Sequence, residues 1–223
     1  MLKYDAVIFD HDGTIVDSAP GILKSANAAF AALGFPLMEL SQFMPFLGPP
    51  LQRSFMDFAG MSAEQAQQAI AIYRREYAAG NCFCLEIYEG MELLLRNLRA
   101  AGIKTAVASS KPTVYLEKIL CGIGLRELFD AVCGVDLKRL DESKADIIAE
   151  AAQACVVPFE RCIMVGDRRF DAEGARALSM PCAGALYGYG TREELEQAGA
   201  AYLVQNCAEL ESLILPSAPA QAN

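Results

Sequence analysis

The chain has 223 residues, of which 53% are hydrophobic and 21% are charged, and this composition excludes an intrinsically disordered protein. With 28 acidic and 19 basic side chains the formal net charge is −9, which argues against a nucleic acid polymer as partner. At about 150 residues per domain, the length predicts one full domain with a smaller inserted or appended unit.

Local sequence disfavours membrane and secreted proteins. The longest uncharged apolar stretch, residues 177–190, is interrupted by Pro181 and by glycines, and it is shorter than the roughly 20 residues that span a bilayer. The apolar run near the N-terminus, residues 6–9, is too short for a signal peptide. We therefore expect a cytoplasmic protein that has no contact with a membrane.

The cysteines point away from disulfides and from zinc. The chain has eight cysteines and one histidine, and apart from Cys82 and Cys84 the cysteines are scattered singly. No two of them have the spacing of a metal site. We therefore expect buried free thiols.

Short apolar runs predict the strands of a sheet that is buried on both faces. The first run, residues 4–9, ends at Asp10. Similar runs recur at residues 103–108, 131–134, 162–165 and 182–186. Because helical patterns separate several of these runs, we expect an α/β fold with a doubly wound parallel sheet.

Every periodic segment between the first two predicted strands is helical. Three helices are expected, at residues 18–34, 50–60 and 62–79. In the second, Leu51, Phe55 and Phe58 share one face. The third begins with a capping box formed by Ser62 and Gln65.

This helical interval is too long for an ordinary crossover, which needs only about a dozen residues. We therefore expect residues 17–88 to form an inserted helical cap domain. Residues 1–16 and 89–215 would form the core domain, and the Pro- and Ala-rich residues 216–223 a flexible tail.

Acidic side chains follow two of the predicted strands. Asp10 and Asp12 follow the first strand, and side chains two positions apart in an extended segment point the same way. Their mutual repulsion predicts a divalent cation with oxygen ligands, a shifted pKa on one carboxyl, or both. Asp167 and Asp171 follow the strand at 162–165, so we expect all four acids to face one region.

Hydroxyl and ammonium side chains also lie at the end of a predicted strand and at the start of a predicted helix. Ser109 and Ser110 end the strand at 103–108 and Lys111 comes next, while Lys144 begins a helix that Ser143 is expected to cap. Hydroxyls, helix N-termini and ammonium groups all bind phosphoryl oxygens.

Four segments resemble, in order and spacing, the motifs of the haloacid dehalogenase-like (HAD) hydrolase superfamily: VIFDHDGTIVDS, VASSK, SK at Lys144, and MVGDRRFD. The helical insertion resembles the α-helical cap of the phosphoglycolate phosphatase and β-phosphoglucomutase branch. The segment LYGYGTREELEQAGAAYLV is similar to bacterial phosphatases of that branch, often called phosphoglycolate phosphatases or 5'-nucleotidases. The resemblance implies a Rossmann-like core and a phosphatase that acts on a small phosphorylated metabolite.

The same resemblance implies a catalytic role for four residues. Asp10 would be the nucleophile that forms an aspartyl-phosphate, and Asp12 would protonate the leaving oxygen and later activate water. Ser109 would donate a hydrogen bond to the phosphoryl group. Lys144 would contact Asp10 and the phosphate.

A bound Mg²⁺ is implied as well. Its ligands would be Asp10, Asp167 and the backbone carbonyl of Asp12, with Asp171 supporting or ligating the ion. No other cofactor is expected, because phosphoryl transfer depends mostly on positioning and electrostatics.

Four further residues keep two interpretations each. Ser110 and Lys111 are candidates for contacting the substrate, although a solvated lysine is equally consistent with the pattern. Arg53 is the cap residue expected at the far end of the substrate, with a solvated helix arginine as the alternative. His11 stands where relatives usually carry an aliphatic residue. Because alternation turns it away from the site, we expect a packed or hydrogen-bonded bystander, with tuning of Asp12 as the alternative.

Three functions stay open at this point. Asp12 argues against a dehalogenase or a phosphonatase, whose first motifs lack this acid, and leaves a phosphatase or a sugar phosphomutase of the β-phosphoglucomutase type. A non-catalytic phosphate-binding or regulatory module is the alternative from another class. The expected partner is a small phosphate ester, and the protein would be a monomer or a homodimer.

Overall fold

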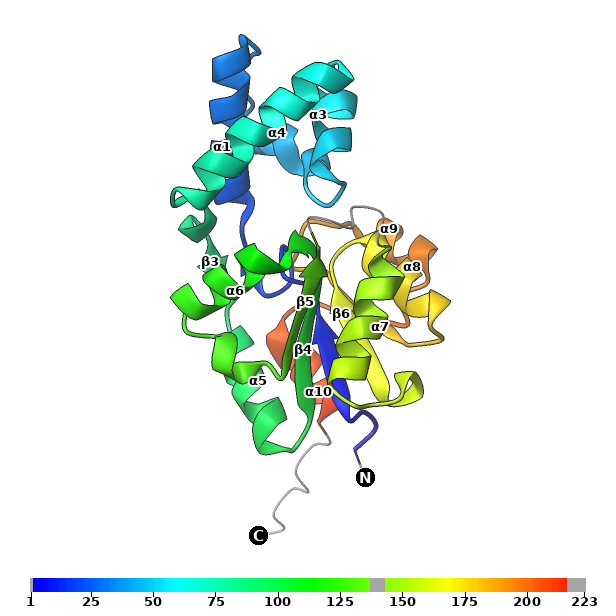
Figure 1. The fold of residues 1–223 in the computed structure, drawn as a ribbon. Helices are drawn as coiled ribbons and strands as arrows, with labels where there is room; N and C mark the ends of the chain where they lie inside the picture. The colour runs from blue at the N-terminus through cyan, green and yellow to red at the C-terminus, as the bar shows by residue number, and fades with distance from the viewer. Residues whose placement is uncertain (1, 137–142, 216–223) are drawn as a thin grey trace. The chain divides into compact units, whose positions relative to one another are not determined.

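The computed structural model describes residues 2–136 and 143–215. The chain divides into two compact units (Figure 1). One unit, here called the core unit, comprises residues 1–15 and 87–223, and the other, the helical unit, comprises residues 16–86. The tail expected at residues 216–223 lies outside the described residues.

The described part of the core unit contains a six-stranded sheet in the order β5-β4-β1-β6-β7-β8 (Figure 1). Its strands are β1 (Ala6–Phe9), β4 (Lys104–Pro112), β5 (Ala131–Val135), β6 (Cys162–Gly166), β7 (Cys182–Ala185) and β8 (Tyr202–Val204). All neighbouring strands pair in parallel, which confirms the predicted α/β class. The apolar runs did not predict β8.

Strand β1 lies in the middle of the sheet and is buried along its whole length. Ala6 pairs with Lys104 of β4 on one side and with Cys162 of β6 on the other. The strand order reverses at β1, and ligands of such sheets bind at the carboxyl ends of strands beside that reversal. The loops after β1, β4 and β6 are therefore brought to one place.

Helices flank the sheet: α5 (Met91–Ala100), α6 (Thr113–Gly122), α7 (Lys144–Ala154), α8 (Arg169–Ala177), α9 (Arg192–Ala198) and α10 (Cys207–Ile214). Helix α7 buries Ile147, Ile148 and Ala151 in an apolar cluster that includes Ile8 of β1. Its N-cap is Ser143, whose hydroxyl accepts the Asp146 N–H, as the sequence predicted. This packing fixes the position of the first residue of α7 over the sheet.

The helical unit contains α1 (Ala19–Leu33), α2 (Leu40–Phe43), α3 (Leu51–Ala59) and α4 (Ala63–Ala78). Phe30, Phe46, Phe55 and Tyr73 pack ring against ring in its interior. The predicted capping box of Ser62 and Gln65 is present at the start of α4. Of the residues expected to share one face of α3, Phe55 is buried, whereas Phe58 is 44% exposed.

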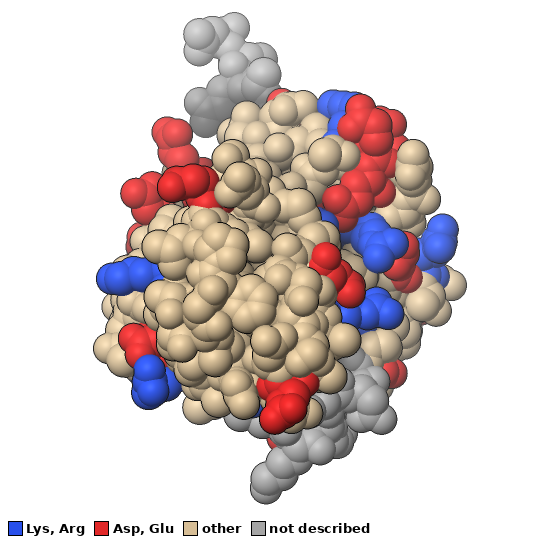
Figure 2. Space-filling view, turned by 90° about the horizontal axis from the view of Figure 1, so that it is seen from above, with Lys and Arg blue, Asp and Glu red and all other residues tan. Residues whose placement is uncertain are grey.

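The chain passes between the two units at β2 (Val16–Asp17) and β3 (Glu86–Ile87), which pair in a two-stranded sheet. Among the described residues no helix is both long enough and apolar enough to cross a membrane. On the face shown in Figure 2 most of the surface is uncharged, and Lys and Arg side chains lie singly or beside acidic ones.

All eight cysteines lie in the described ranges, and all eight are free thiols, as expected. Six of them are buried, but Cys121 is exposed and Cys84 is half-buried, so the expectation of burial was wrong for these two.

Candidate active site at the carboxyl ends of three strands

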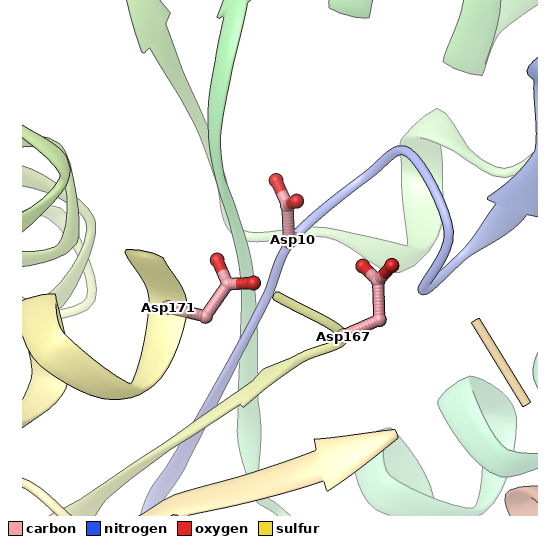
Figure 3. A group of neighbouring side chains, drawn as sticks. All are labelled: Asp10, Asp167 and Asp171. Atoms are coloured by element: carbon pink, nitrogen blue, oxygen red, sulfur yellow. The ribbon is translucent and has the colours of Figure 1, made fainter. Parts of the chain in front are cut away.

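Three carboxylates from separate parts of the core unit converge at the end of the sheet (Figure 3). Asp10 follows β1, Asp167 follows β6, and Asp171 lies in the first turn of α8. One carboxylate oxygen from each lies within 4.8 Å of the others. The Asp10 N–H donates to the carbonyl of Val165 over 2.8 Å, which holds the loop after β1 against β6.

Asp171 reaches the group because β6 ends in a glycine. A Cβ atom on Gly166 would lie under 3.0 Å from the carboxyl carbon of Asp171, so a larger residue there would displace this side chain. Oδ2 of Asp171 accepts the backbone N–H of Arg168 over 3.0 Å. This contact at the start of α8 turns the carboxylate toward Asp10.

Asp167 is held by both of its oxygens. The Thr14 hydroxyl donates to Oδ1 over 3.0 Å, and the backbone N–H of Tyr189 donates to Oδ2 over 2.8 Å. Cβ atoms on Gly188 and Gly190 would lie under 3.0 Å from atoms of Asp167. The loop can therefore approach the aspartate this closely only because these two positions have no side chain. We call this set of contacts the Asp167 cradle. It fixes the carboxylate before any ligand binds.

The sequence did not predict the Asp167 cradle. From the sequence, Tyr187 and Tyr189 of the segment YGYG at residues 187–190 can be interpreted either as filling a loop or as lining the site, and neither interpretation identifies the Tyr189 N–H as a partner of Asp167. The Tyr187 hydroxyl donates to the carbonyl of Thr14 over 3.3 Å, and its ring packs against Tyr88 with the ring centres 4.9 Å apart. The aromatic and glycine residues of this segment therefore fix the loop against the first motif.

Burial and neighbouring acids raise the pKa values of two of the three carboxyl groups, those of Asp167 and Asp171. Burial and the neighbouring charges of Asp171 and Asp10 raise the pKa of Asp167 well above its ordinary value. Burial raises the pKa of Asp171 to about 6, although the Lys144 ammonium partly offsets this effect. Close carboxylates in a desolvated site shift in this way unless a cation joins them.

Lys144, the first residue of α7, lies between two of these acids. Its Nζ is 2.9 Å from Oδ1 of Asp10 and 2.8 Å from Oδ1 of Asp171, and the side chain is 8% exposed. Burial alone would lower the pKa of the ammonium, but the charges of Asp10 and Asp171 outweigh burial and raise the pKa. Lys144 is therefore a permanent positive charge beside Asp10.

The Asp12 carboxylate is not among the three whose oxygens lie within 4.8 Å of one another. Its Oδ1 lies 2.7 Å from Nζ of Lys111 and 3.1 Å from Nδ1 of His11. Burial raises the pKa of the Asp12 carboxyl, but the contacts with Lys111 and His11 outweigh burial and lower it below its ordinary value. Asp12 is thus paired with a lysine and a histidine, whereas Asp10, Asp167 and Asp171 offer their oxygens to one small space.

The end of β4 explains how Lys111 reaches Asp12. Pairing between β4 and β5 shifts register between Ser109 and Pro112, so these residues leave the regular ladder. The Ser109 hydroxyl accepts the Lys111 N–H over 3.3 Å, and both side chains are buried. Ser110 is exposed.

The two remaining candidates lie differently. His11 was expected as a bystander turned away from the site, and its ring is indeed buried, but Nδ1 is at hydrogen-bond distance from Asp12. Arg53 is exposed on α3 of the helical unit.

The donor set of the three acids fits a hard divalent cation such as Mg²⁺. Asp10, Asp167 and Asp171 offer oxygen ligands within a small buried space, and carboxylate oxygen is the ligand that this ion prefers. A cation there would also stabilise the charged forms of Asp167 and Asp171, whose pKa values are raised by burial and by neighbouring acids. The Asp12 carboxylate lies outside this group.

Comparison with known proteins places this geometry in a family. The 5'-nucleotidase of Pseudomonas aeruginosa is 32% identical over 212 residues, covering 95% of this chain and 95% of that protein. Tyrosine-protein kinase PtkA of Mycobacterium tuberculosis is 35% identical over 192 residues, which are 86% of this chain and 65% of that protein. The solved structure of a predicted phosphatase from Clostridium acetobutylicum has 39% sequence identity and a TM-score of 0.88, over 95% of this chain and 98% of that one.

The family model agrees with these relatives. The model described as haloacid dehalogenase-like hydrolase matches residues 7–185. This range contains Asp10, Asp12, Ser109, Lys144, Asp167 and Asp171. The chain therefore belongs to the haloacid dehalogenase-like hydrolase family.

Proposed function

We propose that the protein is a Mg²⁺-dependent phosphatase that hydrolyses a small phosphorylated metabolite through an aspartyl-phosphate on Asp10. The observation that carries the proposal is the difference in exposure within the group of three acids. Asp10 is 13% exposed, whereas Asp171 is 1% and Asp167 is 0% exposed. A substrate can reach Asp10, while the two buried acids are suited to hold a cation.

In the first step an Asp10 carboxylate oxygen attacks the phosphorus of the ester, and the bond from phosphorus to the ester oxygen breaks. The leaving oxygen takes a proton from Asp12, which must enter this step protonated. Because Lys111 and His11 favour the carboxylate in the free site, Asp12 has to gain this proton when the negatively charged ester binds beside it. Lys144 lies against Asp10 and offsets the negative charge that gathers at the phosphoryl group. The bound Mg²⁺ would supply the remaining charge neutralisation and polarise a phosphoryl oxygen.

In the second step water attacks the phosphorus of the aspartyl-phosphate. Asp12, now a carboxylate, accepts a proton from this water, and the bond from phosphorus to Asp10 breaks. Inorganic phosphate leaves, and both acids return to their first state. The contacts of Asp12 with Lys111 and His11 favour the carboxylate form that this step needs. Dividing hydrolysis in this way replaces one difficult step by two easier ones.

The remaining candidates concern the substrate. We propose that Ser109, Ser110 and Lys111 contact the phosphoryl group, and that Arg53 of the helical unit selects the leaving group. Nucleoside monophosphates and phosphoglycolate are the first substrates to test, because relatives of this family are named for such phosphatases. Arg53→Ala should change the ranking of substrates, whereas Asp10→Asn should abolish hydrolysis of all of them.

Transfer of the phosphoryl group to another hydroxyl is the alternative, since a phosphomutase would pass the phosphoryl group through the same Asp10 and one relative is named a tyrosine-protein kinase. One experiment separates the alternatives. The purified protein is given an aryl phosphate and Mg²⁺, with and without an added sugar or tyrosine-peptide acceptor, and phenol and inorganic phosphate are both measured.

Equal amounts of phenol and phosphate, lost in excess chelator and in Asp10→Asn, would support a phosphatase. Phenol in excess of phosphate when the acceptor is present would support a transferase. If no ester in a panel of phosphorylated metabolites releases phosphate, while circular dichroism shows a folded protein, the non-catalytic module replaces the proposal.

A further inference from the structure

His11 lies at the centre of the first motif, between the two acids of the proposed mechanism. The side chain is 0% exposed, and its carbonyl accepts the N–H groups of Thr14 and Ile15, which fixes the backbone of the turn. A buried imidazole at such a position needs a physical reason.

The two ring nitrogens have different surroundings. Nδ1 is 3.1 Å from Oδ1 of Asp12, whereas Nε2 is buried and has no hydrogen-bond partner within the described ranges. A neutral imidazole carries one N–H, and a buried N–H without an acceptor is costly. The tautomer with the proton on Nδ1 places this N–H on the Asp12 carboxylate and leaves only a lone pair at Nε2.

Keeping this histidine costs stability. The unpaired Nε2 loses its hydrogen bond to water, and a leucine of similar volume would fill the same space without that loss. Residues that are unfavourable for folding are expected at functional positions, so the presence of His11 in this turn is best explained by the contact of its Nδ1. That nitrogen contacts the acid that must exchange a proton twice in each turnover.

We propose that His11 is a positioning residue for Asp12, whose Nδ1–H fixes the orientation of the carboxyl group. This inference rests on the proposed phosphatase function. His11 and Lys111 both contact Oδ1, so an Asp12 that carries a proton is best protonated on Oδ2. The two contacts on one oxygen therefore decide which oxygen faces the leaving group with its proton.

The test uses a matched pair of variants. His11→Asn retains an N–H donor at the position of Nδ1, because the asparagine amide and the first ring nitrogen lie at the same distance along the side chain. His11→Leu removes the donor and keeps an apolar volume. If the leucine variant does not fold, His11→Met serves in its place.

The informative readout is kcat/KM for two substrates that share a phosphoryl group, because kcat/KM reports only the steps up to release of the leaving group and not the second step, which both esters share. An alkyl phosphate has a strongly basic leaving oxygen that needs a proton from Asp12, whereas an aryl phosphate has a weakly basic one. We expect His11→Leu to lower kcat/KM for the alkyl ester about tenfold and for the aryl ester by less than about twofold. His11→Asn should recover most of the loss on the alkyl ester.

Thermal unfolding separates this role from a structural one. Because the leucine has no unpaired nitrogen, its Tm should equal or exceed that of the wild type. An unchanged ratio of alkyl to aryl kcat/KM in His11→Leu, or an equal loss on both esters with a lowered Tm, would overturn the inference.

The two proposals fail in different ways. A wild-type protein that releases phosphate from neither ester would reject the phosphatase itself. An active wild type whose Asp12→Asn variant loses the alkyl ester, beside an unaffected His11→Leu, would reject the role of His11 alone.

Discussion

The backbone N–H of Tyr189 donates a hydrogen bond of 2.8 Å to Oδ2 of Asp167, across 22 residues of sequence. This bond ties the loop after β7 to the acid that follows β6. A backbone donor cannot rotate away as a side chain can, so it holds the carboxylate in a single orientation. The proposed metal ligand is thus oriented by the fold and needs no ion for its orientation.

Gly188→Ala should weaken metal binding. The added Cβ would overlap with Asp167 and with the carbonyl of Gly13, so the loop must shift and the Tyr189 N–H moves with it. We expect the affinity for Mg²⁺ or Mn²⁺ to fall by about tenfold or more, as losses of supporting contacts typically do. Titration calorimetry measures this without substrate.

Gly184→Ala is the control for that variant, because the atoms nearest to its Cβ would belong to the side chains of Leu195 and Leu203. Gly184 lies in β7 and Gly188 in the loop that follows this strand, so both changes add a methyl group to the same segment. Of the two, Gly188→Ala is the change that crowds Asp167. Equal metal affinities in the two variants would contradict the role of the Asp167 cradle.

Thr14 should act through its hydroxyl. Thr14→Val keeps the shape of this fully buried side chain but removes the donor to Oδ1 of Asp167. We expect weaker metal binding and a loss of stability of about 1–3 kcal/mol, because a buried charged acceptor loses a partner. Thr14→Ser keeps the hydroxyl and should bind metal with nearly wild-type affinity. Similar affinities for valine and serine would show that the hydroxyl is not needed.

Lys144→Met should affect both stability and the first chemical step. Removal of one partner from a buried ion pair leaves the carboxylates of Asp10 and Asp171 uncompensated, which costs about 3–5 kcal/mol. Denaturant unfolding measures this loss, and added Mg²⁺ should recover part of it. Formation of phosphoenzyme, followed by rapid quench, should slow by about two decades or more. Phosphoenzyme formed at the wild-type rate would exclude Lys144 from this step.

In the presence of a chelator the stability should fall as the pH rises from about 4 to 6. Asp167 and Asp171 have raised pKa values, that of Asp171 being about 6, so the folded protein keeps protons that an unfolded chain has released. Unfolding then releases protons, and a higher pH favours it. Acids with lowered pKa values act in the opposite direction, but only below about pH 4.

Urea unfolding at several pH values checks this expectation. Excess Mg²⁺ should remove the decline, and Asp167→Asn should reduce it in the chelated protein. A stability that is flat or rises across this range in the chelated wild type would show that the acids do not repel one another as described.

The parts of the site that sequence predicted are those that depend on local pattern. An apolar run that ends in Asp10 or Asp167 specifies a buried strand with an acid at its carboxyl end, and parallel pairing then brings such ends together. Ser143 and Asp146 likewise define a helix start within four residues, and this start places Lys144. None of these steps requires knowledge of distant contacts.

The parts that sequence did not predict depend on contacts between distant segments. The pairing of Asp12 with Lys111 joins residues 99 positions apart, and Lys111 lies where the pairing of β4 with β5 shifts register. The Asp167 cradle depends on a backbone N–H, which has no signature in residue type. Strand β8 has three residues, too few to show a periodic pattern.

The glycines of the Asp167 cradle limit how this chain can be recombined with a relative. A Cβ on Gly13 would overlap with Asp167, and one on Gly188 would overlap with both Asp167 and the carbonyl of Gly13, so three separate stretches of the gene fit only as a set. A crossover between residues 14 and 166 would take Gly13 from one parent and Asp167 from the other. A crossover between residues 168 and 185 would take Asp167 from one parent and the loop at 186–190 from the other. Chimeras should therefore inherit residues 10–14, 167 and 186–190 from a single parent.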